Sequence, residues 1–226
     1  MQLSQLWRYP MKSLAGEPLE HSQLGSSGLP GDRRVAAFEP EAAQPDKPVS
    51  ARQRPALLKF RARSAGASVE VWGGDGPWAP WDLPEVAAQL GAACHTRLEL
   101  RAVPEGAFDD SPILILHLAT VRALGEELGR AVDPRRFRAN LYLDGPGLGA
   151  YEEPGLLGRR LRVGRAVLEV AAVCPRCTIP TRDPDTWAVW PQLLRHLVQT
   201  RDEVAGAYCR IVSPGEVGVG DPAVLE

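Results

Sequence analysis

Residues 170–185 read Val-Ala-Ala-Val-Cys-Pro-Arg-Cys-Thr-Ile-Pro-Thr-Arg-Asp-Pro-Asp, an apolar run that ends in two cysteines and a loop rich in proline and aspartate. The apolar part, up to Val173, is typical of a buried strand. Arg176 lies between Cys174 and Cys177. A positive charge beside a thiol favours the thiolate, which is the form that binds metals or attacks as a nucleophile. We therefore interpret the rest of the chain as a scaffold that presents this sulfur beside an anion-binding pocket.

Short strand-like segments, separated by glycine and proline turns, run along the whole chain. The segment 113–118 is an unbroken apolar run, which indicates a strand buried on both faces. Helices are predicted over 83–90, from a Thr120 cap to a stop at Gly129, and over 191–201. These patterns predict a mainly β fold with a few helices, in the α+β class, with barrel-like sheets. Further strands are predicted at residues 3–9, 34–38, 57–62, 68–72, 96–101, 136–143, 161–170, 208–212 and 217–225.

Length and charge limit the classes of protein that this chain can represent. A length of 226 residues with 44% apolar residues suits one large domain or two small ones. A soft boundary at residues 101–110 divides the chain into 1–105 and 106–226. A formal net charge of −2 provides no general attraction for nucleic acid or for an anionic membrane surface. Anion recognition must therefore be local.

Apolar runs and cysteines bear on the cellular compartment. No apolar run approaches the roughly 20 residues that span a bilayer. The N-terminus has no basic start followed by a long apolar block. We therefore expect a cytoplasmic protein that does not associate with membranes. The four cysteines are too few for a disulfide scaffold and should be reduced in the cytosol.

The Cys-Pro-Arg-Cys segment at 174–177 leaves several interpretations open. Half of a zinc site would need a second pair at a similar spacing, and Cys94 or Cys209 would have to converge on it. A thiol–disulfide couple normally opens a helix after a strand, whereas Pro180 and Pro184 disfavour a helix here. A third alternative is one functional thiolate with the other cysteine in the core. The fourth is two buried cysteines without any chemistry.

Basic residues at three places are candidates for binding an anion. Arg138 and Asn140 are two residues apart, so on a strand they would point to one face and offer a guanidinium beside an amide. Lys12 and Ser13 follow a proline turn and offer a point charge beside a hydroxyl. Arg33 begins a predicted strand. Exposed strand edges and solvated turns use the same residue types, so these patterns alone leave the choice open.

Motifs for several other chemistries are absent from the sequence. It contains no phosphate-binding glycine loop and no dinucleotide fingerprint. Ser111 lacks the surroundings of a hydrolase nucleophile. His117 lies within an apolar run, so we expect a core histidine there. Trp187 and Trp190 follow the cysteine loop closely, and we expect them to pack in the core.

A set of segments, taken in order, resembles the MOSC family, the domain found at the C-terminus of molybdenum cofactor sulfurases. The likeness is stronger to its amidoxime-reducing branch, which includes the mitochondrial amidoxime-reducing component and bacterial YcbX-type proteins. The resemblance covers nearly the whole chain. Residue 139 is alanine where the family's RFRPN segment has proline. The segments are YPMKSLAGE at 9–17, GDRR at 31–34, RFRAN at 136–140, CPRC through TRDPDT at 174–186, and VGVGDP at 217–222.

The resemblance implies an N-terminal β-barrel subdomain at 1–105 and a MOSC domain at 106–226. It also implies a molybdenum–pterin cofactor whose metal is bound by Cys177, a role in which a thiolate suits the metal. The implied reaction is a two-electron reduction of N-hydroxylated compounds at that metal, with Cys177 as the catalytic residue. Cys174 would then be a supporting or packed residue. The pterin and its phosphate would be held by Lys12, Ser13, Arg33, Arg138, Asn140 and Arg176.

Departures from the family pattern limit what the resemblance implies. Trp187 stands where a glycine is common, so we expect a different pocket shape. The iron–sulfur domain of YcbX-type proteins is absent from the sequence, so electrons would come from a separate partner protein. The aminotransferase-like half of the sulfurases is absent as well, so pyridoxal phosphate is not expected.

Two alternatives to a reductase stay open at this point. In the first, the chain is a sulfur carrier or a molybdenum cofactor-binding module without reductase activity, and Cys177 holds a persulfide. In the second and weaker one, the chain is a structural zinc protein. Molybdenum, added sulfur and zinc can each be measured on the purified protein, so the alternatives are separable.

Overall fold

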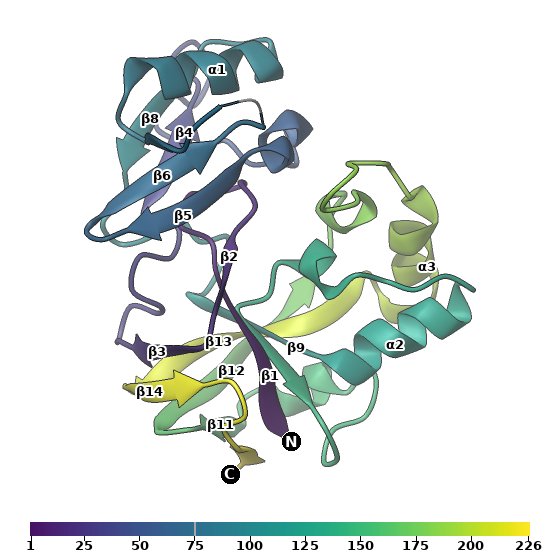
Figure 1. Ribbon diagram of the computed structural model, residues 1–226. Helices are drawn as coiled ribbons and strands as arrows, with labels where there is room; N and C mark the ends of the chain where they lie inside the picture. Colours follow the sequence, from purple (N-terminus) through teal and green to yellow (C-terminus); the bar gives the residue numbers. More distant parts are fainter. Residues whose placement is uncertain (75) are drawn as a thin grey trace. The chain divides into compact units, whose positions relative to one another are not determined.

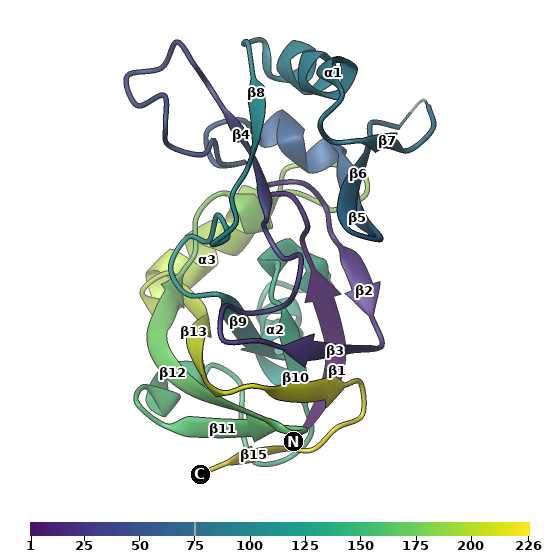
Figure 2. The ribbon, with the colours of Figure 1, turned by 90° about the vertical axis from the view of Figure 1, so that its left-hand side faces the viewer.

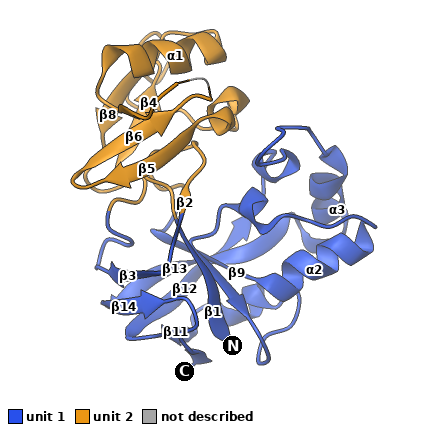
Figure 3. Cartoon of the chain, in the orientation of Figure 1, with its two compact units in different colours: residues 1–7, 18–30, 110–226 blue, residues 8–17, 31–109 orange. Residues whose placement is uncertain are grey.

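The computed structural model describes residues 1–74 and 76–226, which form two compact units (Figure 1). Unit 1 contains residues 1–7, 18–30 and 110–226, and unit 2 contains residues 8–17 and 31–109 (Figure 3). The chain therefore passes between the units several times, and neither unit is one continuous stretch of sequence.

Unit 1 contains a large sheet, two helices and several short 3-10 turns. Among the described residues, every helix is too short or too polar to serve as a bilayer crossing. The elements of unit 1 are β1 (Gln2–Arg8), β2 (Glu17–Leu19), β3 (His21–Leu24), β9 (Ile113–His117), α2 (Leu118–Glu127), η2 (Pro134–Phe137), β10 (Leu141–Asp144), η3 (Glu153–Leu156), β11 (Arg160–Val163), β12 (Ala166–Pro175), η4 (Ile179–Thr181), α3 (Pro191–Arg201), β13 (Val204–Ser213), β14 (Gly215–Gly218) and β15 (Ala223–Leu225).

Eight of the described strands of unit 1 form one sheet in the order β15-β11-β12-β13-β9-β10-β1-β2, and β3 and β14 form a separate two-stranded sheet. Strands β9 and β10 run parallel, with Ile115 opposite Leu141, and α2 lies between them in sequence. The pairs β1–β10, β12–β13 and β13–β9 are antiparallel. The sheet curls strongly (Figure 2). This architecture confirms the prediction of a mainly β, barrel-like fold with a few helices.

Strand β9 is buried on both faces, as its unbroken apolar run predicts. Ile113 and Ile115 pack in one hydrophobic cluster, and Leu114 and Leu116 pack in another. Because side chains alternate along a strand, this one segment contributes to both cores.

Different elements cover the two faces of the sheet. Leu124 of α2 and Leu197 of α3 are fully buried in the cluster that contains Leu116, so these helices cover one face (Figure 1). Leu24 of β3 and Val217 of β14 are buried in the other cluster. Figure 2 shows β3 and β14 side by side across the curl of the sheet. Unit 1 is therefore a layered core with helices on one side and a two-stranded ribbon on the other.

Unit 2 has a hydrophobic core of its own, to which Val86 and Leu90 of its helix contribute. A parallel bridge joins Met11 to Val35, and the Lys12 backbone N–H donates to the Val35 carbonyl at 2.8 Å. The elements of unit 2 are β4 (Val35–Phe38) paired with β8 (Glu99–Ala102), η1 (Pro55–Lys59), the sheet β5 (Arg61–Ala65), β6 (Ser68–Trp72) and β7 (Ala79–Pro80), and α1 (Pro84–Cys94).

Helix α2 begins differently from the prediction. Its N-cap is His117, whose Nδ1 accepts a hydrogen bond from the Ala119 N–H at 3.2 Å. Thr120 is fully buried inside the helix, and its hydroxyl donates to Glu153 at 2.9 Å. His117 is buried as expected, and this burial lowers its pKa. The buried carboxylate at 153 therefore engages the threonine that was expected to cap the helix.

Two segments that were expected to be strands begin as 3-10 turns. Residues 55–59 form η1, and β5 starts only at Arg61. Residues 134–137 form η2, and β10 starts only at Leu141. In both cases a proline lies at the first helical positions, where its fixed φ suits a helical turn. Helix α3, in contrast, has the predicted limits of 191–201.

We expect Ile115→Ala to lower the free energy of unfolding by about 2–5 kcal/mol, because a fully buried side chain leaves a cavity in the middle of the sheet. Urea denaturation followed by circular dichroism measures the change. Val224→Ala, at a side chain that is 54% exposed on the edge strand β15, is the control and should shift stability by less than about 0.5 kcal/mol. Equal effects of the two variants would contradict the burial of Ile115 in the middle of the sheet.

Candidate functional site

The two cysteines of the loop have different environments. Cys174 lies near the end of β12, is 2% exposed and packs in the cluster beneath the helices. Cys177 lies two residues beyond the strand, just before η4, and is partly exposed. Cys94 and Cys209 are buried, and burial raises the pKa of both thiols. Cys177 is thus the cysteine best placed to meet a ligand.

Ion pairs attach the loop that follows Cys177 to η2. The Asp183 carboxylate accepts hydrogen bonds from the Thr186 and Asp185 backbone N–H groups, and these bonds lower its pKa. Arg136 donates to Asp183 at 2.6 Å, and its side chain is only 3% exposed. Arg135 pairs with Asp185 at 2.5 Å. The loop is therefore held by several charged contacts from one short turn.

Arg138 and Asn140 do not form the strand pair that the sequence suggested. Arg138 ends η2 in a left-handed conformation, and β10 begins after Asn140. The Asn140 side chain is 1% exposed; its Oδ1 accepts from the Leu114 N–H and its Nδ2 donates to the Trp7 carbonyl, both at 3.2 Å. The amide therefore joins β9 to β1, beside backbone hydrogen bonds from the Asn140 N–H to the Leu114 carbonyl and from the Trp7 N–H to the Asn140 carbonyl, both at 2.8 Å.

Arg176 points into the protein interior. Its Nε donates to the Ala205 carbonyl at 2.7 Å, and its Nη1 donates to the Phe137 carbonyl at 2.9 Å. The residue is 8% exposed. In this arrangement the guanidinium contacts backbone oxygens of β13 and of η2.

Lys12 and Ser13 lie in unit 2 beside β4. The Lys12 Nζ donates to the Ala107 carbonyl at 2.7 Å and to Asp109 at 2.6 Å. The Ser13 hydroxyl accepts a hydrogen bond from the Ala51 N–H at 2.8 Å. Both residues are largely buried. Lys12 is therefore held as a charged group in a defined position.

Arg33 is the third predicted anion-binding residue in unit 2. Its guanidinium pairs with the fully buried Asp32 and lies 5.0 Å from the Tyr9 ring centre. Burial opposes its charge, but Asp32 and other neighbours outweigh this and raise the pKa of Arg33. Asp32 also accepts from the Tyr9 backbone N–H at 2.6 Å. Lys12 and Arg33 are thus both preorganised by carboxylates.

Asp109 is a residue that the sequence patterns did not identify. Burial alone would raise its pKa, yet the charges of Lys12, Arg33 and Arg52 lower it overall. Its side chain is 50% exposed. A carboxylate surrounded by several cations marks a place in unit 2 that favours negative oxygens. Asp109 lies within the soft boundary at residues 101–110, where the sequence has no periodic pattern that could have identified it.

Backbone strain coincides with several predicted site residues. Ser13, Arg33 and Arg138 have φ values of 75°, 53° and 55°. Trp187, in the cysteine loop, has a φ of 60° and is 38% exposed. The expectation that Trp187 packs in the core was therefore wrong. Left-handed conformations cost a non-glycine residue roughly 1–2 kcal/mol and persist where the surroundings impose them, often at functional sites. Trp190 instead packs against the cluster beneath the helices.

The described residues contain no group of three or more His, Cys, Asp or Glu side chains that could hold a metal ion. A structural zinc site requires such a group, so this part of the chain does not favour the zinc alternative. A metal that binds one protein thiolate and takes its other ligands from an organic cofactor does not require such a group of side chains. Cys177 is compatible with that second kind of binding.

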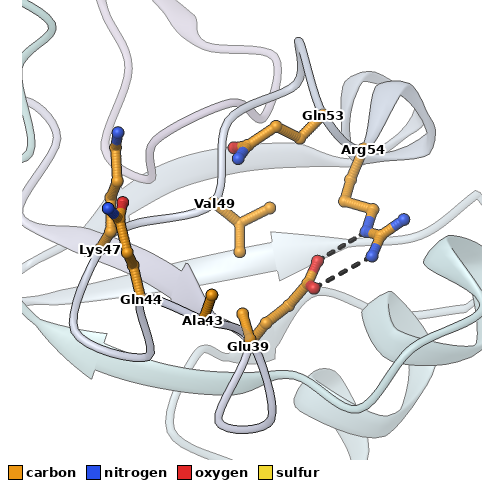
Figure 4. A pocket seen from close by; sticks show the side chains of 8 residues that line it. Glu39, Ala43, Gln44, Lys47, Val49, Gln53 and Arg54 are labelled. Carbon is orange, nitrogen blue, oxygen red and sulfur yellow. Dashed lines mark hydrogen bonds and ion pairs between the residues drawn. The ribbon is translucent and has the colours of Figure 1, made fainter.

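A separate pocket of about 520 Å³ lies in unit 2 and contains none of the predicted site residues (Figure 4). Glu39 and Arg54 form a paired contact at 2.6 and 3.0 Å on one side of it. The pocket is lined by Glu39, Ala42, Ala43, Gln44, Lys47, Val49, Gln53 and Arg54.

Both parts of the chain match models of known domain families. The family model for the MOSC domain matches residues 87–224, and the model for the MOSC N-terminal beta barrel domain matches residues 1–107. Human mitochondrial amidoxime-reducing component 1 is 24% identical over 281 aligned positions, covering 99% of this chain and 82% of the human protein. The mouse protein of the same name is 24% identical over 287 positions, with the same coverage.

A solved structure supports the fold. The crystal structure of the YuaD protein from Bacillus subtilis aligns with 99% of this chain and 94% of its own, with a TM-score of 0.54 and 14% sequence identity. At this identity the likeness concerns the fold alone.

We expect Arg138→Gly to be more stable than Arg138→Ala by about 1 kcal/mol, because both remove the guanidinium but only glycine adopts a positive φ without strain. Urea denaturation of the two variants gives the difference directly. The same pair at Arg122, within α2, is the control and should show the opposite order by about 1 kcal/mol. The same order at both positions would contradict the left-handed conformation at 138.

Proposed function

Because the chain belongs to the MOSC domain family, we propose that it binds a molybdenum–pterin cofactor and reduces N-hydroxylated compounds. The observation that carries this proposal is the placement of Cys177, a partly exposed cysteine on a loop held by ion pairs, among cysteines that are otherwise buried. The relatives whose name includes amidoxime reduction match along nearly the whole chain, which supports the same class of substrate.

The chemistry of the side chains fits such a cofactor. A thiolate is a suitable ligand for a heavy transition metal, and metal binding keeps it deprotonated. A phosphate is bound well by cations that are already held in position. Lys12 and Arg33 are held in this way, because each pairs with a carboxylate. Within unit 1 we propose that Arg138 contacts the pterin phosphate, whereas the buried Asn140 is held by β9 and β1. For Lys12, Ser13 and Arg33 of unit 2, a role in binding the cofactor remains a prediction of the resemblance.

Each residue would have a separate task in the reaction. The bound cofactor supplies two-electron redox chemistry at its metal. Cys177 would hold the metal, and Arg138 would neutralise the anionic part of the cofactor and orient it. Reduction of an N–OH group consumes two electrons and two protons, breaks the N–O bond and releases water. The electrons would come from a separate partner protein.

The division of the chain belongs to the same proposal. We place an N-terminal β-barrel part at 1–105 and a MOSC part at 106–226. The matched ranges of the two family models support a division in this region. Residues 1–7 and 18–30 nevertheless pack in unit 1, so the two parts share strands.

We expect the protein to contain close to one molybdenum per chain after expression in a host that makes the cofactor, and Cys177→Ala to lose at least nine tenths of it, because the variant lacks the ligand. Metal analysis by plasma mass spectrometry measures the content. Cys94→Ala, at a buried cysteine of unit 2, is the control and should keep its molybdenum.

Molybdenum retained in Cys177→Ala, or absent from the unmodified protein, would contradict the proposal. A labile added sulfur on Cys177 without bound pterin, seen by mass spectrometry of the intact protein, would instead identify a sulfur carrier.

We expect Arg138→Ala to weaken cofactor retention roughly tenfold or more, because a hydrogen bond to a charged group contributes about 1.5–3 kcal/mol. Retention is measured as molybdenum content after dialysis, alongside circular dichroism to verify the fold. Arg195→Ala, at an exposed arginine of α3, is the control and should behave like the unmodified protein. An Arg138 variant with full retention would place the anion site elsewhere.

A further inference from the structure

We propose that Arg176 is a positioning residue that joins the cysteine loop to the turn carrying Arg138, in place of the direct contact with the cofactor that the family resemblance implies. The inference rests on the proposed function, in which Cys177 and Arg138 hold the cofactor. It concerns how this chain sets the distance between those two residues before any cofactor binds.

The contacts of Arg176 connect three segments of unit 1. Its backbone N–H donates to the Glu203 carbonyl at 2.7 Å, and its Nε donates to the Ala205 carbonyl at the start of β13. Its Nη1 donates to the carbonyl of Phe137, the residue before Arg138. One side chain therefore bonds to the backbone on both sides of the cysteine loop.

The space around the guanidinium is shaped for it. The Arg176 carbon Cζ lies 5.2 Å from the Phe137 ring centre. Gly206 has a φ of 83°, and a Cβ there would lie 3.1 Å from the Arg176 Nη2 and 2.6 Å from the Ile115 carbonyl oxygen. The positive φ and the Ile115 carbonyl thus favour glycine at 206, and the missing Cβ also leaves room for the guanidinium against β13. The residue is 8% exposed, so a ligand in solvent does not reach this group without a rearrangement.

Glu153 is a buried acidic group on whose pKa the charge of Arg176 acts. Glu153 is fully buried and accepts hydrogen bonds from the His117 N–H and the Thr120 hydroxyl, both at 2.9 Å. Burial raises the pKa of Glu153, and the positive charge of Arg176 acts in the opposite direction. The Arg176 Nη2 is buried and has no hydrogen-bond partner. The guanidinium is therefore held mainly by the backbone carbonyls of Ala205 and Phe137.

This geometry makes the shape of the side chain important as well as its charge. A guanidinium is planar and offers several donors in fixed directions, so it bonds to the Ala205 and Phe137 carbonyls at the same time. A lysine ammonium at 176 would keep the charge without this fork. A direct phosphate contact, in contrast, would tolerate lysine well, because lysine also binds phosphate.

The first test uses the unmodified, cofactor-free protein and needs no variant. In ¹⁵N nuclear magnetic resonance, the Arg176 Nε hydrogen, assigned from its contact with the Phe137 ring, should exchange with water at least tenfold more slowly than that of the exposed Arg195. Equal exchange rates would overturn the proposal, because a guanidinium that waits for a ligand in solvent is not bound to backbone carbonyls.

The second test uses Arg176→Lys without cofactor and follows amide hydrogen exchange by mass spectrometry. Peptides that cover residues 137–140 and 203–207 should exchange at least tenfold faster than in the unmodified protein. Arg138→Ala should leave both peptides unchanged. Leu161→Ala, a cavity variant at a fully buried residue of β11, is the control for general destabilisation.

The third measurement is cofactor retention of the same variants after expression in a host that makes the cofactor. Arg176→Lys should retain at least tenfold less molybdenum, whereas Leu161→Ala should retain it normally at a temperature where it is folded. Two results would overturn the positioning role. One is amide exchange in the Arg176→Lys peptides at the rate of the unmodified protein, and the other is full molybdenum retention despite faster exchange. An unmodified protein without molybdenum would overturn the proposed function instead, and the first two measurements would still test the contacts of Arg176.

Discussion

Strand β9 has to satisfy two hydrophobic cores at once, and the arrangement of unit 1 follows from this constraint. Its alternate side chains face the helices on one side and the β3–β14 ribbon on the other. Neighbouring β13 pairs with it, and β12 pairs with β13 in turn. Cys174 then lies in the core beneath the helices, and the chain leaves the sheet two residues before Cys177. A central strand with two buried faces thereby fixes where Cys177 lies relative to the sheet.

Several buried cations of the protein are paired with carboxylates. The net charge is close to zero, yet Lys12, Arg33 and Arg136 are buried or nearly buried beside carboxylates. A buried cation is costly without a partner, so each of these contacts also determines the direction of the side chain. Left-handed backbone also occurs at 13, 33 and 138, and it persists only where the surroundings of each residue impose it.

The sequence predicted the central strand, one helix and the family, but it did not predict the turn at 134–138. The apolar run at 113–118 and the periodicity at 191–201 report burial directly, so β9 and α3 agree with the structure. The ordered segments resembling the MOSC family led to the correct family. The turn at 134–138 was mistaken for a strand, because an apolar–polar alternation in so short a segment does not separate a strand from a 3-10 turn capped by a left-handed residue.

The sequence by itself therefore determined the fold class, the family and the identity of the cysteine loop, since those depend on periodicity and on motifs that are local in the chain. Only the tertiary structure decided the direction of Arg176, the bonding of Asn140 to β1 and β9, and the presence of Asp109 beside Lys12. Each of these involves partners that are 26 or more positions away, up to 133. Side-chain direction depends on what folding brings alongside, and no local pattern encodes that.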